Sequence, residues 1–116
     1  MRRDDAYLLD ILDASRLALE YISETTFQAF LRDVKSQDAV IRRFIVIGEA
    51  ARRISPETRS RYPQLPWSEM VSMRNLVVHD YDDIDLPILW DTANQDLPKL
   101  IAMLEEIGVS EFGTTR

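Results

Sequence analysis

The sequence contains no cysteine, a single histidine and only three glycines among its 116 residues. Without cysteine the chain has no disulfide framework, no zinc ribbon and no thiol nucleophile. A transition-metal site would have to combine His79 with carboxylates, because the chain offers no second imidazole. The glycines, at positions 48, 108 and 113, are too far apart to form a phosphate-binding loop. We therefore expect neither a metal nor a cofactor.

Long hydrophobic runs are also missing. No apolar stretch approaches the roughly 18 residues that a membrane span needs. The N-terminal residues MRRDDAYLLD contain two arginines but turn acidic at once, unlike a signal peptide. The length suits one domain, which we place at residues 1–107, with a flexible tail at 108–116. With no cysteine and no export signal, we expect a cytoplasmic protein without membrane contact.

The charges are unevenly distributed along the chain. The net charge of −6 argues against non-specific binding to nucleic acid. Residues 80–96 contain six aspartates and no lysine or arginine. Residues 42–61 contain six arginines, namely Arg42, Arg43, Arg52, Arg53, Arg59 and Arg61. These are either solvated helix faces or a local basic surface, which would meet a phosphate backbone, an acidic partner or the aspartates of a second copy.

The spacing of apolar residues is helical throughout and predicts an all-α bundle of four long helices with one or two short ones. The face of the first helix comprises Leu8, Leu12, Ser15, Leu19 and Ile22. A short helix is expected around 27–31. The next long helix, capped by Ser36 or Asp38, has one apolar stripe of Val40, Phe44, Ile47, Ala51 and Ile54. Gly48 inside this helix costs about 1 kcal/mol relative to alanine, which predicts a close helix crossing there.

Proline and aspartate mark the remaining helix ends. Ser55-Pro56 reads as a cap followed by proline at the first helical position. Pro66 opens a helix whose face we expect to comprise Trp67, Val71, Arg74, Val78 and Tyr81. Asp85 caps the last long helix, which Pro98 should kink near Asn94 and which Gly108 ends.

The segment RNLVVHDY, residues 74–81, holds the candidate chemistry. His79 has the side chain whose ordinary pKa lies nearest physiological pH, so it suits proton transfer. Arg74 is a permanent cation suited to the charge that develops on a phosphorane. Asn75 and Tyr81 can orient a substrate or a water. This set matches metal-free RNA cleavage, in which the 2′-hydroxyl attacks the adjacent phosphate with the help of a base and an acid.

A single histidine must serve two proton-transfer roles in that reaction. A symmetric dimer would bring two copies of Arg74 and His79 into one cleft. On a straight helix these two side chains would diverge by about 140°. They converge only if the helix ends near the following aspartates, or if Arg74 meets the histidine of the second copy. We favour a contribution from the second chain.

The same residues also have purely structural interpretations. A lone histidine near a helix C-terminus commonly interacts with the helix dipole. Arg74 can pair with Glu49 or with an aspartate. Tyr81 can be a core ring with its hydroxyl at the surface. Spacing alone leaves these alternatives open.

The motif R-x4-H-x-Y, here Arg74, His79 and Tyr81, resembles the signature of the HEPN superfamily. More narrowly, it resembles the HepT-like toxins of HEPN/MNT toxin–antitoxin systems. Three longer stretches resemble that family's central helix, its motif helix and its closing helix. They are FIVIGEAARRIS (44–55), PWSEMVSMRNLVVHDY (66–81) and DLPILWDTANQDLPKL (85–100). The resemblance covers about residues 5 to 107.

This resemblance implies a helical homodimer that cleaves RNA without a metal, with the active site at the dimer interface. Arg74 and His79 would be catalytic, and Asn75 would be the supporting polar residue. Tyr81 would accept AMP from a cognate minimal nucleotidyltransferase, the antitoxin, which uses ATP and magnesium. The target would be either transfer RNA or messenger RNA.

Two other functions compete with this one. The chain could be a non-catalytic helical partner or scaffold of a nucleotidyltransferase. It could also be a structural protein that dimerises through Trp67, Met70 and Met73.

Overall fold

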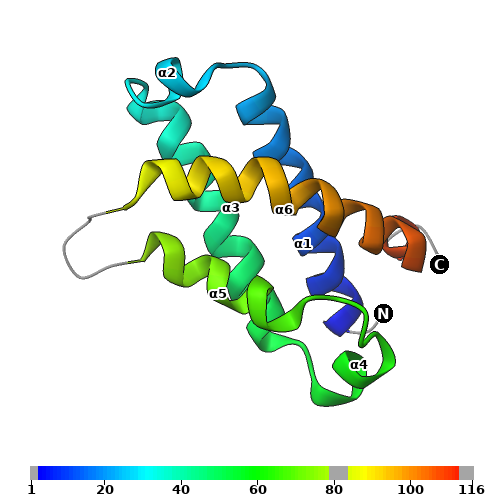
Figure 1. The fold of residues 1–116 in the computed structure, drawn as a ribbon. Helices are drawn as coiled ribbons and strands as arrows, with labels where there is room; N and C mark the ends of the chain where they lie inside the picture. The colour runs from blue at the N-terminus through cyan, green and yellow to red at the C-terminus, as the bar shows by residue number, and fades with distance from the viewer. Residues whose placement is uncertain (1–2, 79–83, 113–116) are drawn as a thin grey trace.

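A computed structural model describes residues 3–78 and 84–112, and every regular element in these ranges is helical. Four helices are long and two are short, as predicted (Figure 1). The elements are α1 (Arg3–Ser23), α2 (Phe27–Phe30), α3 (Val34–Arg53), α4 (Pro56–Arg61), α5 (Trp67–Val77), α6 (Leu86–Ile107) and the 3-10 helix η1 (Val109–Glu111). None of these helices is long and apolar enough to cross a membrane.

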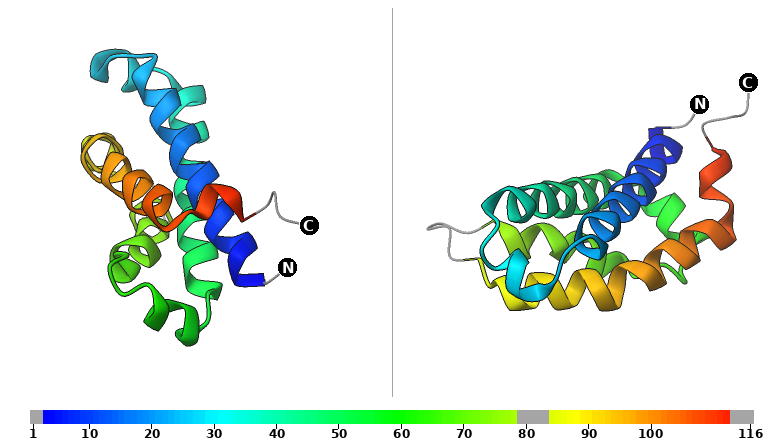
Figure 2. Two further views of the ribbon diagram at one scale, coloured as in Figure 1. Left: turned by 90° about the vertical axis from the view of Figure 1, so that its right-hand side faces the viewer. Right: turned by 90° about the horizontal axis from the view of Figure 1, so that it is seen from above.

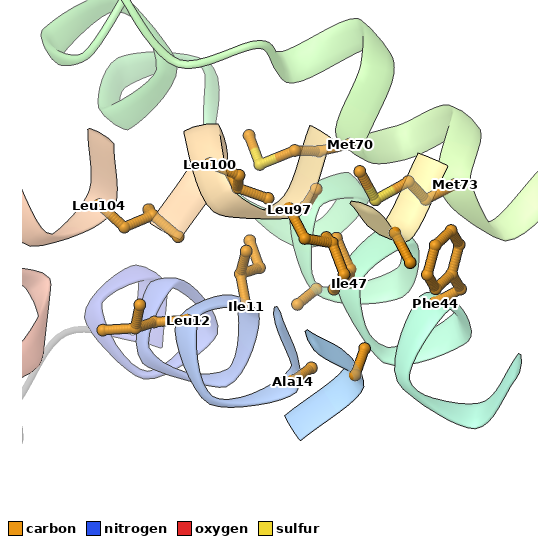
Figure 3. Close-up of a cluster of buried hydrophobic side chains, with 14 of the residues drawn as sticks. Ile11, Leu12, Ala14, Phe44, Ile47, Met70, Met73, Leu97, Leu100 and Leu104 are labelled. Carbon is orange, nitrogen blue, oxygen red and sulfur yellow. The ribbon is translucent and has the colours of Figure 1, made fainter. Parts of the chain in front are cut away.

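Helix α3 is central, because α1 and α5 both pack on it, and α6 packs across α1 (Figures 1 and 2). All five residues of its predicted apolar stripe are buried. The predicted face of α1 is confirmed except at Leu19, which is only partly buried. The core where these helices meet includes Ile11, Phe44, Ile47, Met70 and Leu97 (Figure 3).

Most helix ends follow the predicted signals. Ser55 caps α4 and Asp85 caps α6, each through a side-chain oxygen that accepts a backbone N–H. Gly108 ends α6 with a left-handed φ of 93°. The predicted cap of α3 at Ser36 or Asp38 is wrong, because Asp33 accepts the N–H of Ser36 at 3.3 Å. The first turn of α3 was missed because its Val34 is exposed and adds nothing to the apolar pattern.

Helix α5 differs from its prediction in length and in face. It ends at Val77, and Val78 is extended. Its buried residues are Met70, Met73 and Val77, whereas Val78 is 40% exposed. The predicted face was the neighbouring stripe, whose Trp67, Val71 and Val78 are also apolar. Because Met70 and Met73 lie in the core of one chain, they are not available as the dimer contact considered above.

The chain remains packed beyond the end of α6. Val109, in η1, is fully buried, and η1 contacts both α1 and α6. The domain limit at residue 107 and the flexibility of 108–116 stay predictions, and residues 113–116 lie outside the described ranges.

Pro98 lies inside α6, which continues through it. The kink near Asn94 also stays a prediction.

The predicted close crossing at Gly48 is confirmed. A Cβ placed on Gly48 would lie 2.6 Å from the Cβ of Arg74 and 2.8 Å from its backbone nitrogen. Neither atom belongs to the free end of a side chain. Helices α3 and α5 can therefore approach this closely only because residue 48 has no side chain.

We expect Gly48→Ala to lower the free energy of unfolding by about 1–3 kcal/mol, because the added methyl group forces α3 and α5 apart. Urea denaturation would measure the loss. As a control, Ala102→Gly at an exposed position of α6 reports helix propensity alone and should cost about 1 kcal/mol. A Gly48→Ala variant as stable as the parent would contradict the tight crossing.

Candidate functional site

Arg74 is the best-defined member of the predicted site. It lies in the last turn of α5, where the crossing sets its backbone against Gly48. Its Nε lies 2.6 Å from Oε2 of Glu49, and its side chain is 41% exposed. The pairing of Arg74 with Glu49, one of the structural alternatives, is thus confirmed. The guanidinium remains partly open to solvent and can still meet an anion.

Glu49 is shared among three arginines. Besides Arg74, Nη2 of Arg52 lies 3.1 Å and Nη2 of Arg53 lies 3.5 Å from Oε1 of Glu49. One carboxylate faces three guanidinium groups, so the cluster is positive overall. These four side chains form a local positive centre on a chain whose net charge is −6.

The arginines also set the ionisation of Glu49. The hydrogen bond from Arg52 lowers the pKa of Glu49, against a smaller opposing effect of desolvation. The charges of Arg52, Arg74 and Arg53 lower it further. Arg74 makes the shortest contact, which is an ion pair, whereas Arg52 both forms an ion pair with Glu49 and donates a hydrogen bond to it. Glu49 is therefore ionised at neutral pH and holds Arg74 by charge.

A groove of about 480 Å³ lies between α1, α3 and the end of α5, beside this cluster. Its lining residues are Tyr7 and Asp10 of α1, Arg42, Ile45, Val46, Glu49, Ala50 and Arg53 of α3, and Arg74 and Val78. Partial burial, and then the nearby charge of Asp13, raise the pKa of Asp10. The groove reaches Val78, which directly precedes His79 in the sequence.

The structure places two of the four predicted site residues. Arg74 lines the groove, whereas Asn75 is exposed on α5 and is not among the lining residues. His79 and Tyr81 lie outside the described residues. Because α5 ends before His79, the divergence expected on a straight helix does not apply. The roles of all four residues, and a contribution from a second chain, stay predictions.

Arg42 and Arg53 were expected only as two of six arginines, and Glu49 only as a partner of Arg74, not together as one wall of this groove. Arg42, Glu49 and Arg53 are spaced by seven and four residues, which places them on one face of α3. That spacing could have separated them from Arg43 and Arg52. Tyr7 and Asp10 come from a distant part of the chain, and no local signal connects them to the site.

Removing Arg52 should raise the pKa of Glu49 towards its ordinary value, because the strongest stabilisation of the carboxylate is lost. The ¹³C chemical shift of the Glu49 carboxyl, followed through an acid titration of Arg52→Gln, would measure this pKa. Arg43→Gln removes a charge six residues before Glu49 on α3 but no contact with Glu49, so it should leave this pKa unchanged. Equal pKa values in the parent and Arg52→Gln would contradict the assigned cause.

Comparison with known proteins identifies the family. The profile of a family described as Ribonuclease HepT-like matches residues 11–107. A protein of Thermococcus cleftensis named Probable ribonuclease HepT is 40% identical over 101 residues, which cover 87% of this chain and 92% of that protein. A protein of Methanocaldococcus jannaschii, provisionally named as an RNase, is 38% identical over 102 residues, or 88% and 84% of the two chains. No solved structure matches the chain. The chain therefore belongs to the HepT-like ribonuclease family, as the motif and its surrounding helices predicted.

Proposed function

We propose that this protein is a metal-independent endoribonuclease, the toxin of a toxin–antitoxin system, acting in the cytoplasm as a homodimer. The observation that carries the proposal is the position of Arg74. Its backbone is held at a helix crossing, its side chain is 41% exposed, and it lines a groove with a positive centre. The family, and relatives named as ribonucleases, support RNA as the substrate.

In the proposed reaction the 2′-oxygen of the RNA forms a bond to the adjacent phosphorus, and the bond to the 5′-oxygen breaks. The products are a 2′,3′-cyclic phosphate and a 5′-hydroxyl. Arg74 stabilises the negative charge that builds up on the phosphorane oxygens. Its ion pair with Glu49 limits the motion of the guanidinium, so less ordering is needed when the phosphate binds.

The two proton transfers are assigned to His79. One imidazole removes the proton of the 2′-hydroxyl, and an imidazolium donates a proton to the departing 5′-oxygen. A twofold axis near the C-terminal end of α5 would supply the second imidazole. Asn75, one residue after Arg74 and exposed, would orient the substrate or a water.

Regulation is assigned to Tyr81. A cognate minimal nucleotidyltransferase would transfer AMP from ATP to its hydroxyl, with release of pyrophosphate. The added phosphate is an anion close in sequence to Arg74 and His79. It would compete with the RNA phosphate for the same arginine, as a phosphorylated side chain would.

A non-catalytic scaffold of the nucleotidyltransferase remains the second candidate function. The observation that favours it is the Arg74–Glu49 ion pair, because an arginine already paired within its own chain can be purely structural.

Purified protein should cleave RNA in the presence of EDTA and leave cyclic phosphate ends. We expect His79→Ala and Arg74→Gln to lower the cleavage rate about 10²- to 10⁴-fold, because each removes a proton-transfer or charge-stabilising group. Arg43→Gln, which removes an arginine outside the groove, is the matched control and should cleave like the parent. If His79→Ala cleaves as fast as the parent, the catalytic assignment is wrong.

Incubation with the nucleotidyltransferase, ATP and magnesium should add the mass of AMP to the protein and stop cleavage. Tyr81→Phe should show no added mass, because the acceptor hydroxyl is gone, whereas Tyr62→Phe should be modified normally. Intact-protein mass spectrometry distinguishes these outcomes. Modification at Tyr81 of a protein that has no RNase activity would favour the scaffold function.

A further inference from the structure

We infer that the groove between α1, α3 and α5 binds the single-stranded RNA that flanks the scissile phosphate, with Arg42 and Arg53 contacting phosphates and Tyr7 stacking on a base. The inference rests on the proposed ribonuclease function and extends it, because none of these three residues belongs to the R-x4-H-x-Y motif. All three line the groove that Arg74 also lines.

The arginines are spaced for a strand that runs along α3. Arg42 and Arg53 are eleven residues apart on one face of this helix, or about 16 Å along its axis. Glu49 lies between them in the sequence, and its ion pair with Arg74 places that guanidinium between them as well. A strand with its reacting phosphate at Arg74 would therefore pass Arg42 on one side and Arg53 on the other.

Both flanking arginines are available to an anion. Arg42 is exposed and, among the residues that the structure describes, no carboxylate lies within ion-pair distance of it. Arg53 is 53% exposed and shares Glu49 with two other arginines, so its charge is only partly neutralised. One guanidinium group can donate two parallel hydrogen bonds to two oxygens of the same phosphate. Both side chains are therefore suited to bind an RNA backbone.

The remaining wall of the groove suits a base. Tyr7 is half-buried and packs against the hydrophobic core, which fixes its ring. Ile45, Val46 and Ala50 add an apolar surface beside it. Arginines along the backbone combined with an aromatic ring for a base are the usual elements of single-strand binding. The volume of about 480 Å³ matches small-ligand pockets of about 300–1,000 Å³ and so fits a nucleotide rather than a duplex.

Two carboxylates oppose the three arginines in the groove. Glu49 is neutralised by its ion pairs, but Asp10 has no ion-pair partner among the described residues. An RNA strand in the groove would pass close to Asp10. Asp10→Asn should therefore strengthen RNA binding several-fold, which is the opposite of the effect expected for the arginine variants.

The test measures binding of a fluorescent single-stranded RNA by anisotropy, over a range of salt concentrations, in the His79→Ala protein so that the RNA stays intact. Arg42→Gln and Arg53→Gln should each reduce the slope of log affinity against log salt by about 0.7, the value for one lost phosphate contact with a single strand. Arg43→Gln, next to Arg42 but outside the groove, should leave the slope unchanged.

The aromatic contact is tested in the same protein. Tyr7→Leu should weaken binding about tenfold without changing the salt slope, because stacking carries no charge. Tyr7→Phe keeps the ring and should bind like Tyr7. Since Phe fits wherever Tyr packs, it also separates stacking from any loss of folding.

The outcomes separate this inference from the ribonuclease function. If the parent cleaves RNA but Arg42→Gln and Arg53→Gln change the slope no more than Arg43→Gln, the groove inference is overturned and the nuclease assignment stands. If the parent does not cleave RNA but these variants and Tyr7→Leu weaken binding as described, the groove is supported and the nuclease assignment fails. Absence of any RNA binding overturns the groove inference.

Discussion

The close approach of α3 and α5 at Gly48 is the constraint on which the site depends. With hydrogen in place of a side chain at residue 48, the backbone of Arg74 lies against α3. Glu49, the next residue of α3, then meets the guanidinium of Arg74 at 2.6 Å. Arg52 and Arg53 follow on the same helix and join the same carboxylate. A larger residue at position 48 would move α5 and separate Arg74 from this cluster.

The ion pair between Arg74 and Glu49 is a weaker argument for a structural role than the exposure of Arg74 is for a catalytic one. Solvent-exposed ion pairs contribute little to stability, because solvent screens the charges and ordering the side chains costs entropy. Glycine inside α3 carries a helix-propensity cost of about 1 kcal/mol. The small stability gained from an exposed ion pair therefore does not explain a glycine at position 48. A guanidinium that is held in place and still open to a phosphate explains it better.

Much of the fold could be predicted from the sequence, because some sequence signals are local and are typical of only one structure. The apolar stripe from Val40 to Ile54, the caps at Ser55 and Asp85 and the crossing at Gly48 are of this kind. The face of α5 could not be predicted, because two adjacent stripes both contain several apolar residues. Only the packing of the helices selects Met70, Met73 and Val77. The cap at Asp33 was hidden because the first turn of α3 is exposed.

The site shows the same division between local and distant information. The motif identifies Arg74 from its neighbours in sequence, but the groove beside it combines α1 with α3, whose groove residues are more than thirty positions apart. Tyr7 and Asp10 enter the site only through the packing of these two helices, which rests on core residues such as Ile11 and Phe44. The residue pattern of one helix does not predict which other helix it contacts.

The acidic net charge is compatible with an RNA ligand once distances are considered. At physiological salt, exposed charges more than about 8–10 Å apart barely influence each other. An RNA phosphate at Arg74 would therefore respond mainly to the groove, where three arginines face two carboxylates, and little to the acidic residues elsewhere. Those residues repel RNA from the rest of the surface. An acidic protein with a basic groove thus restricts where RNA can bind, whereas a uniformly basic protein would bind it over its whole surface.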